Sequence, residues 1–166
     1  MESRTAIWFE TSIKYTKIGE DGQDKDVTEI YVVDALSFTE AENRITEEVS
    51  LFTRGDFDVK KISKASYKEI FFSEKDSDDR WYKAKLVFIT INEKTGKEEQ
   101  SSCVYLVQAA SFHAALKNVD SVMSQGMQDY EIHSITETKI IDVYEYKKKS
   151  AKQDNQKPEY EETSEK

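Results

Sequence analysis

The stretch Tyr31-Val32-Val33-Asp34-Ala35-Leu36-Ser37-Phe38 decides the fold, because a matching stretch occurs later in the chain. The second copy is Tyr105-Leu106-Val107-Gln108-Ala109-Ala110-Ser111-Phe112, in which Ser111 lies 74 residues beyond Ser37. Each copy is typical of a β-strand that runs through a short joint into the N-cap of an amphipathic helix. The residues on either side of each copy repeat as well, and together they predict the architecture.

Residues before the first copy predict a β-hairpin. Between residues 7 and 15 apolar and polar side chains alternate, which is typical of a half-buried strand. The cluster from Gly19 to Asp24 contains two glycines and indicates a turn. Residues 27–35 then return as a strand that is apolar on both faces, which favours a central position in the fold.

Residues after the first copy predict a helix and a further strand. Ser37 and Glu40 fit a capping box, and Gly55 is a suitable stop signal. The segment Phe57–Phe72 is predicted to be one long extended segment, with a bulge between Val59 and Ile62 because these apolar residues are three apart. The helix is expected to bury one apolar face, made of Phe38, Ala41, Ile45, Val49 and Phe52.

The second half of the chain repeats this order. Residues 81–88 match residues 8–15 at an offset of 73, and the turn Asn92–Lys97 replaces the first hairpin loop. The irregular three-residue step recurs between Ile132 and Ile135, and Ile141 and Val143 are expected to continue that last strand. A shared irregularity favours an internal duplication over chance similarity. The second helical face consists of Phe112, Ala115, Val119 and Met123, each 74 residues beyond its counterpart.

These patterns predict an α+β fold in which a duplicated β-β-α-β unit forms one pseudo-twofold domain. We expect a mostly antiparallel sheet of about six strands and two main helices. The two repeats are predicted to span residues 6–72 and 80–146. One unit of this size is marginal as an independent core, so we expect the two units to bury their apolar faces together. The single domain is predicted over residues 1–147, and a disordered charged tail over residues 148–166.

Composition and charge exclude several classes of protein. The net charge of −9 argues against general affinity for nucleic acid or for anionic membranes. No apolar run approaches the length of a membrane span, and residues 1–5 lack the features of a signal peptide. A single cysteine rules out an internal disulfide framework. We therefore expect a cytoplasmic protein that does not associate with membranes.

The residues that carry chemistry in other proteins are few here. Neither strand-to-helix joint contains glycine, so a phosphate cradle is not expected. Cys103, His113 and His133 have no suitably spaced partners, and we interpret them as one structural thiol and two surface histidines. The acidic connector Asp76–Asp79 lacks the pattern of a calcium loop, and a solvated linker is the favoured interpretation. We predict no catalytic residue, no cofactor and no metal, and so no enzyme.

One set of residues forms a candidate binding surface. Trp8 and Trp81 open equivalent strands beside lysines, which is typical of platforms that stack single-stranded nucleic acid. Packing of both tryptophans, at sheet edges or between the repeats, is the favoured alternative. A basic segment near Arg54 has no counterpart in the second half. The lysines of that segment are Lys60, Lys61, Lys64 and Lys68.

The chain resembles a family of bacterial and phage proteins that is described only as a domain of unknown function. The resemblance rests on Trp8–Thr11, Tyr31–Glu42 and Asp79–Lys85, and extends over about residues 5–146. It implies no activity and therefore no functional residues. It favours a small accessory protein linked to phages or mobile elements.

Two hypotheses for function follow. The first is a non-enzymatic protein-interaction or assembly module, whose partner is another protein or a second copy. The second is an accessory protein that binds single-stranded nucleic acid through Trp8, Trp81 and the basic segment Lys60–Lys68. The first is favoured, because the duplicated scaffold carries no catalytic constellation.

Overall fold

The computed structural model of the protein describes residues 1–146, and the predicted tail at residues 148–166 lies outside the described residues. Two helices and nine strands form within that range. In chain order the elements are β1 (Glu2–Arg4), β2 (Trp8–Ile18), β3 (Asp24–Asp34), α1 (Phe38–Ser50), β4 (Phe57–Lys64), β5 (Tyr67–Phe72), β6 (Arg80–Ile91), β7 (Glu98–Ala109), α2 (Phe112–Met123), β8 (Asp129–Glu137) and β9 (Ile140–Tyr144).

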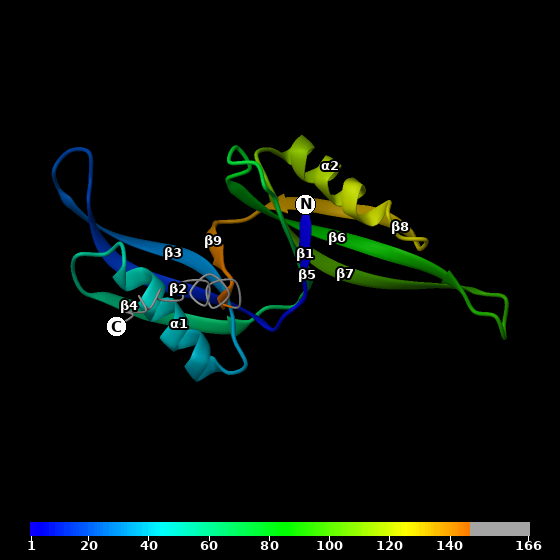
Figure 1. Ribbon diagram of the computed structural model, residues 1–166, viewed down its shortest axis with the longest axis horizontal. Helices are drawn as coiled ribbons and strands as arrows, with labels where there is room; N and C mark the ends of the chain where they lie inside the picture. The colour runs from blue at the N-terminus through cyan, green and yellow to red at the C-terminus, as the bar shows by residue number, and fades with distance from the viewer. Residues whose placement is uncertain (147–166) are drawn as a thin grey trace, which may run out of the picture.

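The strands form two sheets, and each sheet carries one helix (Figure 1). The strand order is β4-β2-β3-β9 in one sheet and β1-β5-β7-β6-β8 in the other. Helix α1 packs on the first sheet and α2 on the second. The β2–β3 and β6–β7 hairpins project at opposite ends of the molecule. The predicted α+β class, the two helices and the mostly antiparallel pairing are confirmed.

The two halves of the chain exchange one strand each. After β4 the chain leaves the first sheet, and β5 pairs in parallel with β7 of the second sheet. After β8 the chain crosses back, and β9 pairs in parallel with β3 of the first sheet. The registers correspond, since Ile70 pairs with Leu106 as Val143 pairs with Val32. Each half therefore completes the sheet of the other.

The exchange corrects two predictions. The segment Phe57–Phe72 is not one strand, because the chain turns at Ala65, whose N–H donates to the carbonyl of Trp8 at 2.8 Å. Ile141 and Val143 do not continue β8, because they lie on β9 in the other sheet. The expected count of about six strands was too low, because two predicted strands are each divided in two and β1 is an additional strand.

The predicted bulge on β4 is confirmed, and β8 has the same irregularity. Lys61 pairs with Ser12 and Val59 with Ile13, so Lys60 is left without a cross-strand partner. On β8 the corresponding register shift falls between Lys85 and Leu86 on β6 and leaves out His133. The two halves therefore match in their irregularities as well as in their regular elements. The internal duplication and the single domain over residues 1–147 stay predictions.

Serine N-caps begin both helices, as predicted. The Ser37 hydroxyl accepts from the N–H of Glu40 at 3.1 Å, and the Ser111 hydroxyl accepts from the N–H of Ala114 at 3.2 Å. Such caps satisfy backbone donors that have no partner within the helix. No helix within residues 1–146 is long and apolar enough to cross a membrane.

A shared core lies between the two sheets and joins the halves. It contains both tryptophans together with side chains from β3, β7 and the exchanged strands β5 and β9. Beside it, Lys83 forms an ion pair with Glu10 at 3.2 Å, and these two residues occupy equivalent positions in the two halves. The buried residues of this core are Trp8, Val32, Tyr67, Ile70, Trp81, Leu106, Ile140 and Val143.

Candidate functional site

Trp8 and Trp81 are buried, which corrects the stacking hypothesis. Their side chains are 1% and 2% exposed, and the Trp81 ring meets Phe72 edge-on with the centroids 5.5 Å apart. A ring that is covered in this way offers no face to a nucleic-acid base. The alternative prediction, in which the tryptophans pack between the halves, agrees with their burial. The Trp8 indole N–H has no hydrogen-bond partner within residues 1–146.

The basic segment does not form one continuous surface. Lys60, Lys61 and Lys64 lie on β4, an edge strand of the first sheet, where Lys60 forms an ion pair with Asp58 at 3.5 Å. Lys68 lies on β5 in the other sheet, with its ammonium group 5.2 Å from the centre of the Phe88 ring. The crossing of the chain between the sheets separates these lysines. The nucleic-acid hypothesis therefore loses both its aromatic rings and its continuous basic strand.

Cys103, His113 and His133 lie on three different elements, namely β7, α2 and β8. Cys103 is partly buried against the core beneath α2, as predicted for a structural thiol. His133 is exposed and lies 3.5 Å from Glu131. No hydrogen bond between described residues joins any two of the three. The geometry of a nucleophile and its base is therefore not formed by these side chains.

Asp78 has a structural role in the connector. It is 6% exposed, and its carboxylate accepts from the Ala110 N–H at 2.9 Å and from the Ser73 hydroxyl. Asp78 therefore holds the joint between β7 and α2 in place from the connector that precedes β6. Within residues 1–146 no group of three or more histidine, cysteine, aspartate or glutamate side chains is arranged to hold a metal ion.

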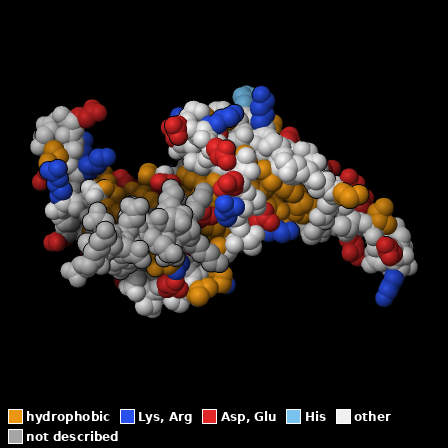
Figure 2. Space-filling view, viewed as in Figure 1, with side chains coloured by type: hydrophobic (Ala, Val, Ile, Leu, Met, Phe, Trp, Pro, Cys, Tyr) orange, Lys and Arg blue, Asp and Glu red, His pale blue; other side chains and the backbone are white. Residues whose placement is uncertain are grey.

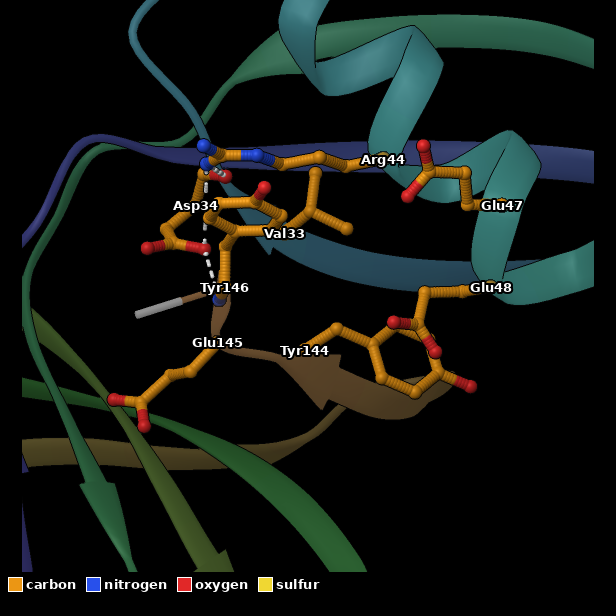
Figure 3. Close-up of a pocket in the computed structure, with 8 residues that line it drawn as sticks. All are labelled: Val33, Asp34, Arg44, Glu47, Glu48, Tyr144, Glu145 and Tyr146. Carbon is orange, nitrogen blue, oxygen red and sulfur yellow. Dashed lines mark hydrogen bonds and ion pairs between the residues drawn. The ribbon is translucent and has the colours of Figure 1, made fainter. Parts of the chain in front are cut away.

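The structure gathers Asp34, Arg44 and Tyr146 at the joint between β3 and α1 (Figure 3). Asp34 ends β3 and is 7% exposed, and its Oδ1 accepts from the Tyr146 N–H at 2.8 Å. Arg44 on α1 donates to the Asp34 carbonyl and pairs with Glu40. The Arg44 guanidinium also lies 4.0 Å from the centre of the Tyr146 ring. We call Asp34, Arg44 and Tyr146 the charged clamp.

An uncharged clamp occupies the equivalent place in the second half. Gln108 replaces Asp34, and its Oε1 accepts from the Ser73 N–H at 2.9 Å. Asn118 replaces Arg44, and its Nδ2 donates to the Gln108 carbonyl at 2.9 Å. Both clamps therefore tie the end of an exchanged strand to the joint between strand and helix. The backbone function is shared, whereas the charge and the aromatic ring occur only in the first half.

The cavity at the charged clamp is too small for a substrate. Its volume is ≈ 40 Å³, and residues of β3, α1 and the end of β9 line it. Pockets that bind small organic ligands usually measure about 300 Å³ or more. A volume of this size holds about one water molecule. The clamp is therefore a site for positioning the chain and for presenting side chains to the outside.

Exposed apolar side chains adjoin the charged clamp. Leu36 and Phe38 are 82% and 55% exposed, and the Tyr146 side chain is 48% exposed. The Leu36 N–H donates to Glu40 at 2.9 Å, and Glu40 pairs with Arg44, so the joint that carries Leu36 is tied to the charged clamp. We call Leu36, Phe38, Arg44 and Tyr146 the α1 N-terminal surface. Figure 2 shows hydrophobic side chains at the lower edge of the lobe that carries α1.

A second polar cluster in the first half surrounds Glu29. Its carboxylate accepts from the hydroxyls of Tyr15 and Tyr31 at 2.8 and 2.5 Å. Burial, followed by the hydrogen bond and the charge of Glu29, raises the pKa of Tyr15 to about 12 and raises the pKa of Tyr31 further. Burial and the charges of Asp142 and Glu29 raise the pKa of Tyr144 to about 12. These phenols therefore act as hydrogen-bond donors and not as bases.

The charged clamp and the surface beside it were not predicted from the sequence. The sequence predicted a strand-to-helix joint at Ala35-Leu36-Ser37, which is where the clamp forms. Arg44 lies outside the predicted apolar face of the helix, and Tyr146 is the last residue of the second predicted repeat. An exposed leucine inside the joint was the available signal, because the second copy has Ala110 at that position.

Comparison with family models gives one match. The model described as a domain of unknown function (DUF4494) covers residues 7–146. This range includes both clamps and every strand and helix except β1. Comparison with curated proteins and with solved structures gives no match. The match agrees with the resemblance inferred from the sequence and assigns no activity.

Proposed function

Since the chain belongs to the DUF4494 family of domains of unknown function, we propose that it is a non-enzymatic protein-interaction module that binds its partner through the α1 N-terminal surface. The observation that carries this proposal is the difference between the halves at one structural position. The first sheet with α1 exposes Leu36 beside Arg44 and Tyr146, where the second sheet with α2 has Ala110, Asn118 and Ser73.

The composition of this surface suits a protein interface. Tyrosine and arginine are enriched among the residues that contribute most to binding between proteins, and charged residues are depleted at interface cores. Leu36 and Phe38 supply apolar area that packing within residues 1–146 leaves exposed. Such residues lose contact with water only when another molecule covers them.

The surface is also held in place before a partner arrives. Arg44 is fixed by Asp34 and Glu40, and Tyr146 is fixed through its N–H and its ring. Phe38 packs edge-on against Phe9, with the ring centroids 5.1 Å apart. Side chains that are already ordered lose little entropy on binding, which favours affinity.

Photo-crosslinking in the producing cells tests the proposal. A photoreactive amino acid replaces Leu36 in one variant and Met127, the fully exposed control in the second half, in another. We expect a discrete protein adduct from position 36 that position 127 does not form. Adding Phe38→Ser to the position 36 variant should abolish the adduct. Adducts of equal yield from both positions, or none from position 36, would contradict the proposal.

A further inference from the structure

The outer edge of β5 is covered by a short strand from the same chain. Strand β1 pairs antiparallel with β5, with Ser3 opposite Phe71 and Arg4 opposite Ile70. The Ser3 hydroxyl donates to Glu69, which fixes the added strand to its neighbour. This sheet therefore has five strands, and its exchanged strand is an inner one.

The outer edge of β9 is the equivalent position, and no strand of the described chain covers it. Strand β9 is the last in the order β4-β2-β3-β9. A groove of ≈ 370 Å³ lies beside it, bounded by Ile141 and Asp142 on one side and the connector at residues 73–79 on the other, with Trp81 also in its lining. An uncovered strand edge presents backbone donors and acceptors that can pair with another extended chain.

The connector does not take the place that β1 takes in the other sheet. Its residues 75–77 correspond to Glu2–Arg4 at the offset of 73, but they form a turn in which the Asp78 N–H donates to the Lys75 carbonyl at 3.0 Å. Asp78 is held in that position by Ser73 and Ala110. The turn in the connector therefore leaves the outer edge of β9 without the added strand that β5 has.

The groove has an excess of negative charge. Five carboxylates and one ammonium group line it. Asp142 accepts from the Val143 N–H at 2.8 Å, and no cation within residues 1–146 pairs with it. Partial desolvation in the groove raises the pKa of Asp142, and the hydrogen bond from the Val143 N–H opposes that rise. The charged residues are Glu74, Lys75, Asp76, Asp78, Asp79 and Asp142.

We propose that an extended segment of a protein partner, carrying a lysine or an arginine, adds antiparallel to the outer edge of β9 in the register that β1 uses on β5. The inference rests on the proposed function only in requiring a protein partner, because it uses a different surface. The chain itself provides the precedent, since it covers the equivalent edge of β5 with an added strand. The charge of the groove selects a basic segment.

The register predicts where the basic residue lies. Ser3 stands opposite Phe71 and reaches Glu69, and the equivalents of these two β5 residues are Tyr144 and Asp142. The residue opposite Tyr144 is therefore the one that reaches Asp142. The Val143 N–H, which Asp142 now accepts, becomes available to the added strand when Asp142 turns to the cation. The Arg4–Glu145 ion pair, at 3.4 Å, marks the end of the open edge.

Nuclear magnetic resonance on the full chain tests this inference. The probe is an acetylated and amidated pentapeptide, Thr-Val-Lys-Val-Thr, and the controls are the same peptide with glutamate for lysine and with N-methylated valines. We expect the lysine peptide alone to shift the amide resonances of Val143 and Tyr144 and to slow exchange of the Val143 amide. The N-methylated control separates strand pairing from simple attraction of charge.

Two variants that each remove one negative charge from the same sheet sharpen the test. Asp142→Asn should weaken binding of the lysine peptide at least about fivefold, as expected for loss of a charge-assisted hydrogen bond. Asp58→Asn on β4, the opposite edge of the same sheet, should change it less than about twofold. Loss of photo-crosslinking at position 36 would leave these results unaffected, so the two proposals fail separately.

Several results would overturn the inference. Equal binding of the glutamate or N-methylated peptide would exclude the basic, strand-forming occupant, as would the absence of shifts at Val143. Shifts at Val143 that follow protein concentration without peptide would assign the edge to a second copy. If replacing Lys147, Lys148 and Lys149 by alanine shifts the Val143 resonance while the peptide does not, the edge of β9 would be assigned to the chain's own C-terminal segment.

Discussion

The charged clamp of the first half and the uncharged clamp of the second half make the same backbone contacts with different side chains. In each, a side chain at the end of a strand accepts from a backbone N–H that follows an exchanged strand, at 2.8 Å for Asp34 and 2.9 Å for Gln108. The fold needs only an acceptor and a donor at these positions. The charge of Arg44 and the ring of Tyr146 go beyond what these backbone contacts need, and we propose that they serve partner binding.

The cluster around Glu29 differs between the halves in a coupled way. Glu29 accepts from the Tyr15 hydroxyl, whereas the second half has Cys103 and Phe88 at these two positions. A phenol without its acceptor would leave a polar group unsatisfied, which costs about 1–3 kcal/mol when buried. Tyr15 and Glu29 are thus replaced together in the second half, whereas Tyr31, the other donor to Glu29, keeps its hydroxyl there as Tyr105.

The largest effect is expected where the halves are alike. Trp8→Ala and Trp81→Ala each empty part of the shared core, so each should lower the free energy of unfolding by about 3–5 kcal/mol in urea denaturation. Phe112→Ala, at a position that is 50% exposed, serves as the control and should cost about 1 kcal/mol or less. A full loss at one tryptophan with little loss at the other would break the equivalence of the halves.

The two clamps should differ by a smaller amount. Arg44→Ala removes a charge-assisted hydrogen bond and a ring contact, and should cost about 2 kcal/mol. Asn118→Ala removes one neutral hydrogen bond and should cost about 1 kcal/mol. Chemical denaturation of both variants measures the difference. A larger cost at Asn118 than at Arg44 would contradict the claim that the charged clamp is the stronger of the two.

The tyrosines around Glu29 predict a loss of stability in alkali. Tyr15 and Tyr144 have pKa values of about 12 in the folded chain and near 10 in the unfolded chain. The folded state therefore holds more protons between pH 10 and 12, and the free energy of unfolding falls as the pH rises through that range. Below pH 10 this contribution is fully present.

Glu29→Gln should make that alkaline loss shallower, because its carboxylate raises the pKa values of Tyr15 and Tyr31. Urea denaturation at pH 8, 10, 11 and 12 measures the slope for both proteins. Glu98→Gln, which removes an exposed carboxylate at the start of β7, should leave the slope close to that of the wild type. A steeper slope in Glu29→Gln would reverse the assigned cause.

The smallest effect on stability is expected at the α1 N-terminal surface. Leu36→Ser should change the free energy of unfolding by less than about 0.5 kcal/mol, because the side chain is 82% exposed. The same substitution should abolish partner binding in competition with the photo-crosslinking variant. A large loss of stability would show that Leu36 serves the fold and would remove the main support for the proposed function.

Sequence patterns predicted the local elements well, because their causes are local. Alternation over residues 7–15 and the serine caps depend on neighbours in the chain, and the bulge followed from the spacing of Val59 and Ile62. The exchange of β5 and β9 could not be predicted in the same way. Which sheet a strand joins depends on pairing with distant residues such as Leu106 and Val32.

The candidate site was harder to predict for a related reason. The side chains of the charged clamp come from β3, from α1 and from Tyr146, which lies two residues beyond β9 and 112 residues from Asp34. Trp8 and Trp81 attracted attention as aromatic residues beside lysines, but their place between the sheets follows from the strand exchange. Exposure of Leu36 likewise depends on the tertiary fold.

The central claim is that each half completes the sheet of the other, so that the two halves unfold as one unit. Native-state hydrogen exchange at increasing denaturant tests it most directly. The account predicts one common opening free energy for the amides of β3, β5, β7 and β9 that are hydrogen-bonded between strands. Loss of protection in β2–β4 while β6–β8 stay protected, or the reverse, would contradict it.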